Sequence, residues 1–197
     1  YNLEPAGPWT NYQPGNDHNA PPITFQLRAL LTNPEFKRAF INRSADLMNS
    51  TLSIQRMTAF INRMAAELSP EMAEHARRWR APADWTAWTN NVAGLHRFAL
   101  NRSASARQHL TNQFGLRGMP LVTLRLNDTN AGVIRWSTLT VNAPTNAPWT
   151  GVYFNNNAIT FFAQPYNGYR FVSWAGLADP GATNATNTIQ LSGPLAL

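Results

Sequence analysis

The stretch Thr32–Ser53, TNPEFKRAFINRSADLMNSTLS, decides how this chain folds. It predicts a helix from Pro34 to about Met48, because Asn33 is a good N-cap residue, Pro34 suits the first helical position and Glu35 suits the positive end of the helix dipole. Its apolar residues form two stripes, which are Phe36, Phe40 and Leu47 on one face and Ile41, Ala45 and Met48 on another. A surface helix needs one stripe, so we expect this helix to pack on more than one side, as the central strut of a helical layer.

Five further helices are expected around this strut. A short helix at residues 23–31 precedes it, with Phe25, Leu27, Leu30 and Leu31 facing inward. Ser53 caps the next helix, whose inward stripe is Met57, Phe60, Ile61, Met64 and Leu68. Ser69-Pro70-Glu71 repeats the cap, proline and acid order seen at Asn33 and predicts a new start, with His75 as a hydrogen-bonded core residue. The last two helices begin at Asp84 and Ser103, and Gly115 is placed for a left-handed end.

The periodicity changes after Gly118, which marks a boundary between modules. Val122, Leu124 and Leu126 alternate, as in a strand. Further strands are expected at residues 133–136, 139–141, 152–154, 158–163, 169–174 and 188–191, the third and fourth of these forming a hairpin about Asn155-Asn156-Asn157. The predicted fold class is therefore α+β, with an extended Pro/Gly/Asn-rich segment at residues 1–22, a bundle of about six helices at 23–118 and a small, mostly antiparallel β module at 119–197.

Composition excludes several function classes. The chain has no cysteine, so disulfides and thiolate chemistry are absent. Its net charge of +6 is spread over several helices, and the densest cluster, Arg77-Arg78-x-Arg80, is interpreted as a solvated helix end and not as a nucleic-acid patch. No apolar run is long enough for a transmembrane segment. Because the chain opens at Tyr1 with no initiator methionine or leader, we expect a fragment or a processed product.

The helical part resembles a known family. The segment LLTNPEFKRAFINRSADLMNSTLS, followed by AAELSPEMAEHARRW, is similar to the region just after the catalytic core of the CotH-type spore-coat kinase family. The resemblance covers residues 30–79 and extends to about Gly115. It implies a parent protein that is an atypical, kinase-like phosphotransferase, with ATP and Mg²⁺ bound by an upstream domain.

The β part has its own resemblance. WTGVYFNNNAITFFAQPYNGYRFVSWAG is similar to the motif of divergent internalin-type B repeats, small grasp-like β modules of bacterial surface proteins. The matching positions are Trp149, Gly151, Tyr153, Phe154, Pro165, Gly168, Tyr169, Phe171, Trp174 and Gly176. Together the two resemblances imply a secreted or cell-surface bacterial protein.

The residues themselves carry no complete phosphotransfer machinery. The sequence has no Gly-rich phosphate loop, its single lysine, Lys37, lies inside a predicted helix, and no pair of histidines has metal-ligand spacing. Asp17 and His18 follow the place of the family's Asp-x-Asp metal segment, but two residues in a loop are more typical of a solvated turn. Glu67, Glu71 and Glu74 are interpreted as a salt-bridged surface. We therefore expect no catalytic, cofactor-binding or metal-binding residue in this chain. Because the resemblance nevertheless implies a kinase-like parent protein, whether the chain is part of an enzyme is undecided.

Three functions stay open. The first is a non-catalytic scaffold whose helices support an upstream catalytic domain and whose β module contacts cell-envelope, spore-coat or matrix components. The second is a contribution by residues 1–22 to an active site supplied mostly upstream. The third is a surface module that binds carbohydrate or other copies of itself. In that reading Trp149, Tyr153, Tyr169 and Trp174 would stack on sugars, whereas the alternative is that they form the core of a small sheet domain.

Overall fold

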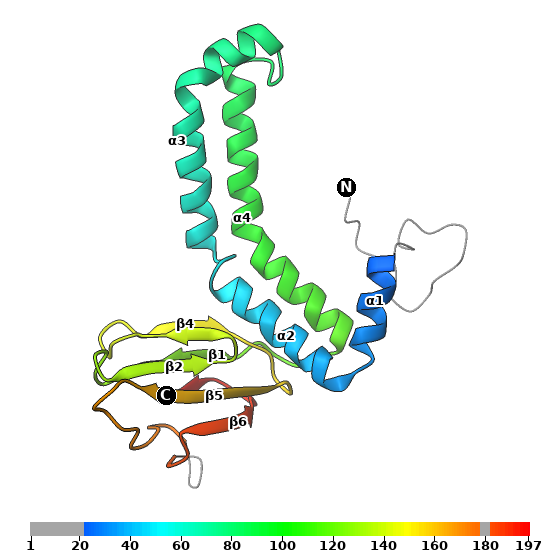
Figure 1. Cartoon of the computed structure of the whole chain (residues 1–197). Helices are drawn as coiled ribbons and strands as arrows, with labels where there is room; N and C mark the ends of the chain where they lie inside the picture. Colours follow the sequence, from blue (N-terminus) through cyan, green and yellow to red (C-terminus); the bar gives the residue numbers. More distant parts are fainter. Residues whose placement is uncertain (1–21, 178–181) are drawn as a thin grey trace. The chain divides into compact units, whose positions relative to one another are not determined.

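The computed structural model describes residues 22–177 and 182–197, without the side chains of residues 22–25. The chain is α+β, as predicted: helices come first and two small sheets follow (Figure 1). By their contacts, residues 1–41 and 42–197 form two units. The extended segment expected at residues 1–22, with Asp17 and His18, lies outside the described residues except for Pro22. The predicted boundary near Gly118 between a helical domain and a β module stays a prediction.

The central helix is confirmed. Helix α1 spans Pro22–Leu31 and helix α2 spans Pro34–Asn49. The side chain of Asn33 caps α2, because its Oδ1 accepts hydrogen bonds from the Glu35 and Phe36 N–H groups at 2.9 and 3.0 Å. Of the two stripes of α2, Ile41, Ala45 and Met48 are buried, and Phe36, Phe40 and Leu47 are half-buried. Helix α2 is thus covered along two faces, whereas Leu30 of α1, expected inward, is 49% exposed.

The described residues form four helices and not six, because two expected breaks are absent. Helix α3 spans Ile54–Trp79 and continues through Pro70. Helix α4 spans Trp85–Phe114 and continues through Ser103, whose hydroxyl donates to the Leu52 carbonyl at 3.1 Å. The predicted ends are confirmed: Ser53 and Asp84 cap the starts, and Gly115 ends α4 in the left-handed conformation, with the Leu116 N–H bonded to the Thr111 carbonyl.

Helices α3 and α4 pack against each other as an antiparallel pair (Figure 1). Met72 and Ala76 of α3 and Ala99 and Ser103 of α4 are buried. The inward stripe predicted for α3 is only partly right, since the side chains of Phe60 and Leu68 are 56% and 50% exposed. His75 does not lie in a core: it is exposed, although its Nε2 is 3.1 Å from the Ala81 carbonyl oxygen.

The end of α3 offers a simple test of backbone strain. Arg80 follows the helix with φ 54°, a left-handed conformation that a side chain disfavours. We expect Arg80→Gly to raise the free energy of unfolding by about 1 kcal/mol, measured by urea denaturation. The matched control is Arg78→Gly, inside the same helix, which should lower it by roughly 1 kcal/mol. An equal loss in both variants would contradict the strain at Arg80.

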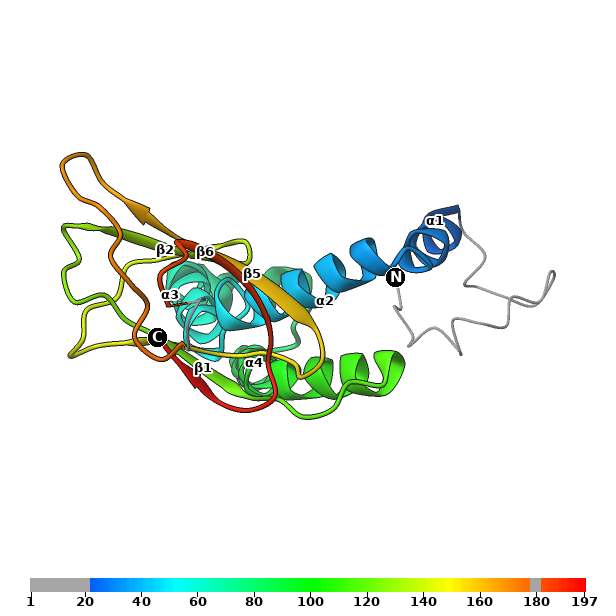
Figure 2. The same ribbon diagram turned by 90° about the horizontal axis from the view of Figure 1, so that it is seen from below.

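The β region contains two sheets. Strands β1 (Leu121–Leu124), β4 (Trp149–Val152) and β7 (Leu195–Ala196) form one sheet in the order β4-β1-β7. Strands β2 (Gly132–Trp136), β3 (Leu139–Val141), β5 (Ala158–Pro165) and β6 (Thr186–Gln190) form the other in the order β3-β2-β5-β6. Figure 2 shows β2, β5 and β6 lying together. The pairings between these seven strands are antiparallel except β1 with β7, which confirms the mostly antiparallel prediction.

Two expectations about the strands are wrong. Strand β4 does not form a hairpin with β5, because it pairs with β1 while β5 pairs with β2 and β6. The turn between them is present, with Asn156 at φ 61°, but it connects two sheets. The strand predicted at residues 169–174 is absent: with both edges of β5 occupied, Trp174 instead bonds through its backbone N–H to the Ala182 carbonyl at 2.7 Å.

Aromatic side chains fill the core of the β region. Trp136, Tyr153, Phe154 and Phe161 are at most 1% exposed. The Trp136 ring stacks on Phe161 at 4.8 Å between centroids and meets the edge of Tyr153 at 5.7 Å. Such pairs add to the area that they bury, so a small sheet region acquires a dense centre.

Candidate functional site

The second half of α2 is joined to the β region by a set of buried and half-buried polar side chains. Asn42, Asp46 and Asn49 follow one another at helical spacing, so their side chains leave the same side of the helix. Each one is hydrogen-bonded to a residue of the β region, between 103 and 116 positions away along the chain. We call these three residues and their partners the polar joint.

Asp46 is the centre of the polar joint and is 0% exposed. Its Oδ1 accepts the Tyr153 hydroxyl at 2.7 Å. Its Oδ2 accepts both the backbone N–H of Thr138 at 3.0 Å and the Thr138 hydroxyl at 2.6 Å. Arg43 extends the network, since its guanidinium donates to the Thr138 oxygen at 2.7 Å. Both carboxylate oxygens are thus satisfied, which is what a buried acid requires.

The tyrosine in this contact is strongly perturbed. Burial raises the pKa of Tyr153 far above its usual value, and the neighbouring Asp46 carboxylate raises it further through its charge and its hydrogen bond. Tyr153 is therefore a neutral donor at any ordinary pH. Its hydroxyl donates to the carboxylate and holds it in place.

Asn49 joins α2 to β4 through a pair of hydrogen bonds like those that a neighbouring strand would make. Its Nδ2 donates to the Val152 carbonyl at 2.8 Å, and its Oδ1 accepts the Val152 N–H at 3.0 Å. Gly151, beside this contact, is buried, and a Cβ there would meet the Trp149 ring and lie 3.0 Å from Asn49 Nδ2. The glycine of the Trp149-x-Gly151-x-Tyr153 motif is thus required mainly by the Trp149 ring, with Asn49 of α2 also close.

Asn42 closes the joint at its other end. Its Nδ2 donates to the Ala158 carbonyl at 2.8 Å, and its Oδ1 accepts from Asn157 at 2.6 Å. Asn157 belongs to the turn between β4 and β5. The three residues of α2 therefore contact both sheets, β4 of one and the start of β5 of the other.

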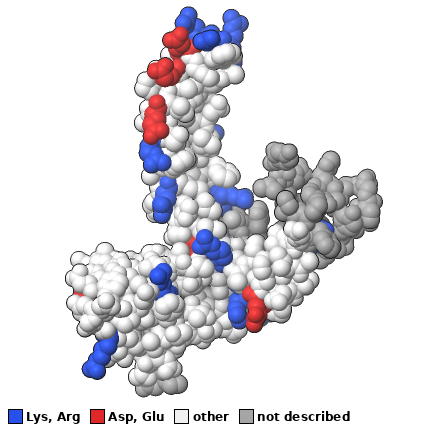
Figure 3. Space-filling model, in the orientation of Figure 1, with Lys and Arg blue, Asp and Glu red and all other residues white. Residues whose placement is uncertain are grey.

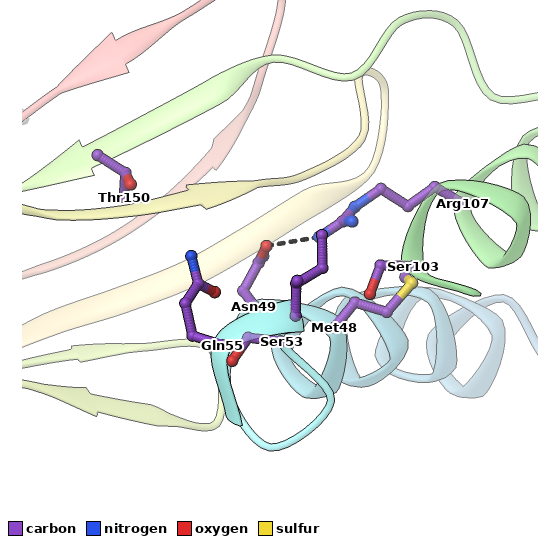
Figure 4. A pocket seen from close by; sticks show the side chains of 8 residues that line it. Met48, Asn49, Ser53, Gln55, Ser103, Arg107 and Thr150 are labelled. Atoms are coloured by element: carbon purple, nitrogen blue, oxygen red, sulfur yellow. Dashed lines mark hydrogen bonds between the residues drawn. The ribbon is translucent and has the colours of Figure 1, made fainter. Parts of the chain in front are cut away.

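A hollow of about 170 Å³ lies beside the polar joint (Figure 4). Its walls come from the end of α2, the first turn of α3, the middle of α4 and strand β4, and they consist of Met48, Asn49, Ser53, Ile54, Gln55, Ser103, Arg107 and Thr150. The guanidinium of Arg107 reaches from α4 toward Asn49, whose Oδ1 it contacts at 2.7 Å. Burial lowers the pKa of Arg107, and its Nε is buried without a hydrogen-bond partner in the described part of the chain.

The four aromatic residues predicted to stack on a ligand occupy different environments. Tyr153 and Trp174 are buried in the core, 0% and 7% exposed. Trp149 is half-buried beside Tyr153, with 6.4 Å between the ring centroids. Tyr169 is 50% exposed. Carbohydrate binding stays a prediction, and only Trp149 and Tyr169 offer a ring to solvent.

Other candidate chemistries can be placed as well. Within residues 22–177 and 182–197, no group of three or more His, Asp or Glu residues could hold a metal ion. Of the three glutamates interpreted as a salt-bridged surface, Glu74 pairs with Arg77 at 3.3 Å, both side chains being mostly exposed. Among the described helices, none is long and apolar enough to cross a membrane.

The residues of the polar joint were not predicted as site residues from the sequence, although the sequence contains a pattern that indicates three of them. Asn42, Asp46 and Asn49 lie one position after Ile41, Ala45 and Met48, the stripe that is buried. Polar residues that flank a buried stripe at its own spacing are candidates for buried hydrogen bonds. Arg107 had no such signal, because its partners come from distant parts of the sequence.

Comparison with known proteins supports the helical resemblance. Residues 6–106, just over half of the 197 residues, match the model of a family described as CotH kinase protein. The match covers α1, α2, α3 and most of α4, and it ends before β1 begins. No curated protein and no solved structure gives a significant match. The likeness of the β region to internalin-type repeats therefore rests on its sequence alone.

Proposed function

Because this chain belongs to the CotH kinase protein family, we propose that it is a non-catalytic, C-terminal portion of a secreted or surface CotH-like bacterial protein, with a scaffolding role. The observation that carries the proposal is the polar joint. Asp46 is the one carboxylate among the described residues that is fully buried, and three donors of the β region occupy its two oxygens. A carboxylate used in this way fixes one part of the fold to another and is not available for proton or metal chemistry.

The pair α3–α4 is the part that would support the catalytic domain of the parent protein. It exposes several large aromatic residues, among them Phe60 at 56%, Trp79 at 60% and Phe98 at 58%. An arginine lies over each of these rings: Arg63, Arg78 and Arg102, in that order. Aromatic residues with arginine are enriched at protein interfaces. Most of this surface lies within the residues that match the family, so the kinase-like domain is the partner that we propose for it.

The charged side chains of the α3–α4 pair are arranged so that an uncharged surface is available for such a contact. In Figure 3 acidic and basic side chains gather along α3 and toward the far end of the pair, while much of the rest of this face is uncharged. In this proposal ATP and Mg²⁺ bind to the upstream domain. The β region, which resembles a surface repeat, would contact envelope, coat or matrix components or a second copy of the chain.

The proposal predicts that this chain does not turn over nucleotide. The folded chain, verified by its thermal melt, is incubated with Mg²⁺ and ATP labelled at the γ-phosphate, and released and protein-bound label are measured. We expect no more of either than in a protein-free control. Mg²⁺-dependent turnover would overturn the scaffold proposal, and its loss in a folded Asp17→Asn variant would favour the alternative that residues 1–22 belong to an active site.

A further inference from the structure

The hollow beside the polar joint has an unbalanced charge. None of its eight lining residues is acidic, and Arg107 is the only one with a charge. Among residues 22–177 and 182–197, the one ion pair within salt-bridge distance is Arg77 with Glu74, so Arg107 has no carboxylate partner there. A partly buried guanidinium without a counter-charge is unfavourable, and an anion in the hollow would relieve that cost.

The donors around the hollow come from several directions. Arg107 brings the positive charge of its guanidinium, which the Asn49 Oδ1 holds in place. Thr150 of β4 and Gln55 of α3 add exposed polar side chains on other walls. The first turn of α3, which begins after its cap residue Ser53, forms one wall of the hollow and adds the positive end of a helix dipole.

This arrangement suits one class of ligand. A carboxylate presents its acceptors in one plane, whereas donors on three elements surround an anion whose acceptors point in three dimensions. The size also fits, since about 170 Å³ corresponds to the space of roughly five or six waters. The hollow is open, so the anion could be free or carried on a larger molecule.

We propose that the hollow formed by Arg107, Asn49, Thr150 and the first turn of α3 is a binding site for a tetrahedral oxyanion of the phosphate class. The site does not depend on the scaffolding role proposed above. It also differs from the nucleotide site of the parent protein, because its donors come from the ends of α2 and α3 and from β4, which lies beyond the residues matched to the family.

The experiment titrates the whole chain with inorganic phosphate at constant ionic strength and follows the Arg107 Nε–H signal by NMR. We expect a saturable shift of this signal, with sulfate competing and acetate not. Arg107→Gln should weaken phosphate binding, followed by calorimetry, roughly 10–100-fold, because a charge-assisted contact is lost. Arg107→Lys should restore part of the affinity, since it keeps the charge without the planar fork.

Two further variants keep the test decisive if Arg107→Gln fails to fold. Gln55→Ala changes an exposed lining residue and should weaken binding about two- to tenfold. Arg102→Gln is the matched control: it removes an exposed arginine of the same helix, one that contacts Phe98, and should leave binding unchanged. A comparison of phosphate with glycerol phosphate distinguishes a free anion from an esterified one.

The results that would overturn the proposal are equally specific. A shift of the Arg107 signal that stays linear in phosphate, or that chloride or acetate reproduces, means a general salt effect. Equal losses in Arg102→Gln and Arg107→Gln would mean that net charge and not the hollow attracts the anion.

Discussion

Asp46→Ala is expected to lower the free energy of unfolding of residues 42–197 by about 3–5 kcal/mol, the largest effect of any single change considered. Three hydrogen bonds end on this carboxylate, and bonds to a charged group contribute about 1.5–3 kcal/mol each, although not additively. The variant leaves the Tyr153 hydroxyl buried with no acceptor. Thermal unfolding should shift down by roughly 10 °C for a region of this size.

Two variants separate the role of the buried acceptor from that of charge. Asp46→Asn keeps the size and one acceptor oxygen but turns an N–H₂ group toward the donors of Thr138 or Tyr153, so we expect a loss of about 2 kcal/mol. Glu71→Ala, on the exposed surface of α3, should change stability by less than about 0.5 kcal/mol. If Asp46→Ala melts within about 2 °C of the unchanged chain, the polar joint does not hold the β region to α2.

The ends of the helices could be predicted because each is encoded locally. Ser53, Asp84 and Gly115 act on backbone groups within five positions of themselves, and all three were identified correctly. The expected breaks at Pro70 and Ser103 were wrong for the opposite reason. Ser69-Pro70-Glu71 has the local chemistry of a helix start, but packing of α3 against α4 outweighs the roughly 3 kcal/mol that an internal proline costs.

Strand pairing and the site could not be obtained in the same way. Alternation of apolar residues locates β1, β2 and β5, but it does not say which edges meet, and the β4–β5 hairpin was wrong for that reason. Asp46 and Arg107 depend on partners that are 107 and 58 positions distant. A single sequence contains no record of such pairs, so the candidate site is visible only in the folded chain.

Tyr153→Phe is expected to change both the stability and its pH dependence. At neutral pH the variant leaves Asp46 Oδ1 buried without its donor, and we expect a loss of about 1–3 kcal/mol. At high pH the sign follows from the raised pKa of Tyr153. The folded chain keeps its phenolic proton, while the unfolded chain loses it above about pH 10, so the unfolded state binds fewer protons and stability falls as pH rises.

The unchanged chain should therefore lose about 1.4 kcal/mol of stability per pH unit above 10, and Tyr153→Phe should lack this slope. The two unfolding free energies, measured in urea between pH 7 and pH 11.5, should converge at the alkaline end. The Tyr153 hydroxyl stabilises the polar joint at neutral pH, but its ionisation in the unfolded chain opposes folding at high pH. Tyr169→Phe, which removes a half-exposed hydroxyl, should keep the slope of the unchanged chain. Parallel curves for Tyr153→Phe and the unchanged chain would show that Tyr153 reaches solvent, and that the contact between α2 and β4 is looser than the distances describe.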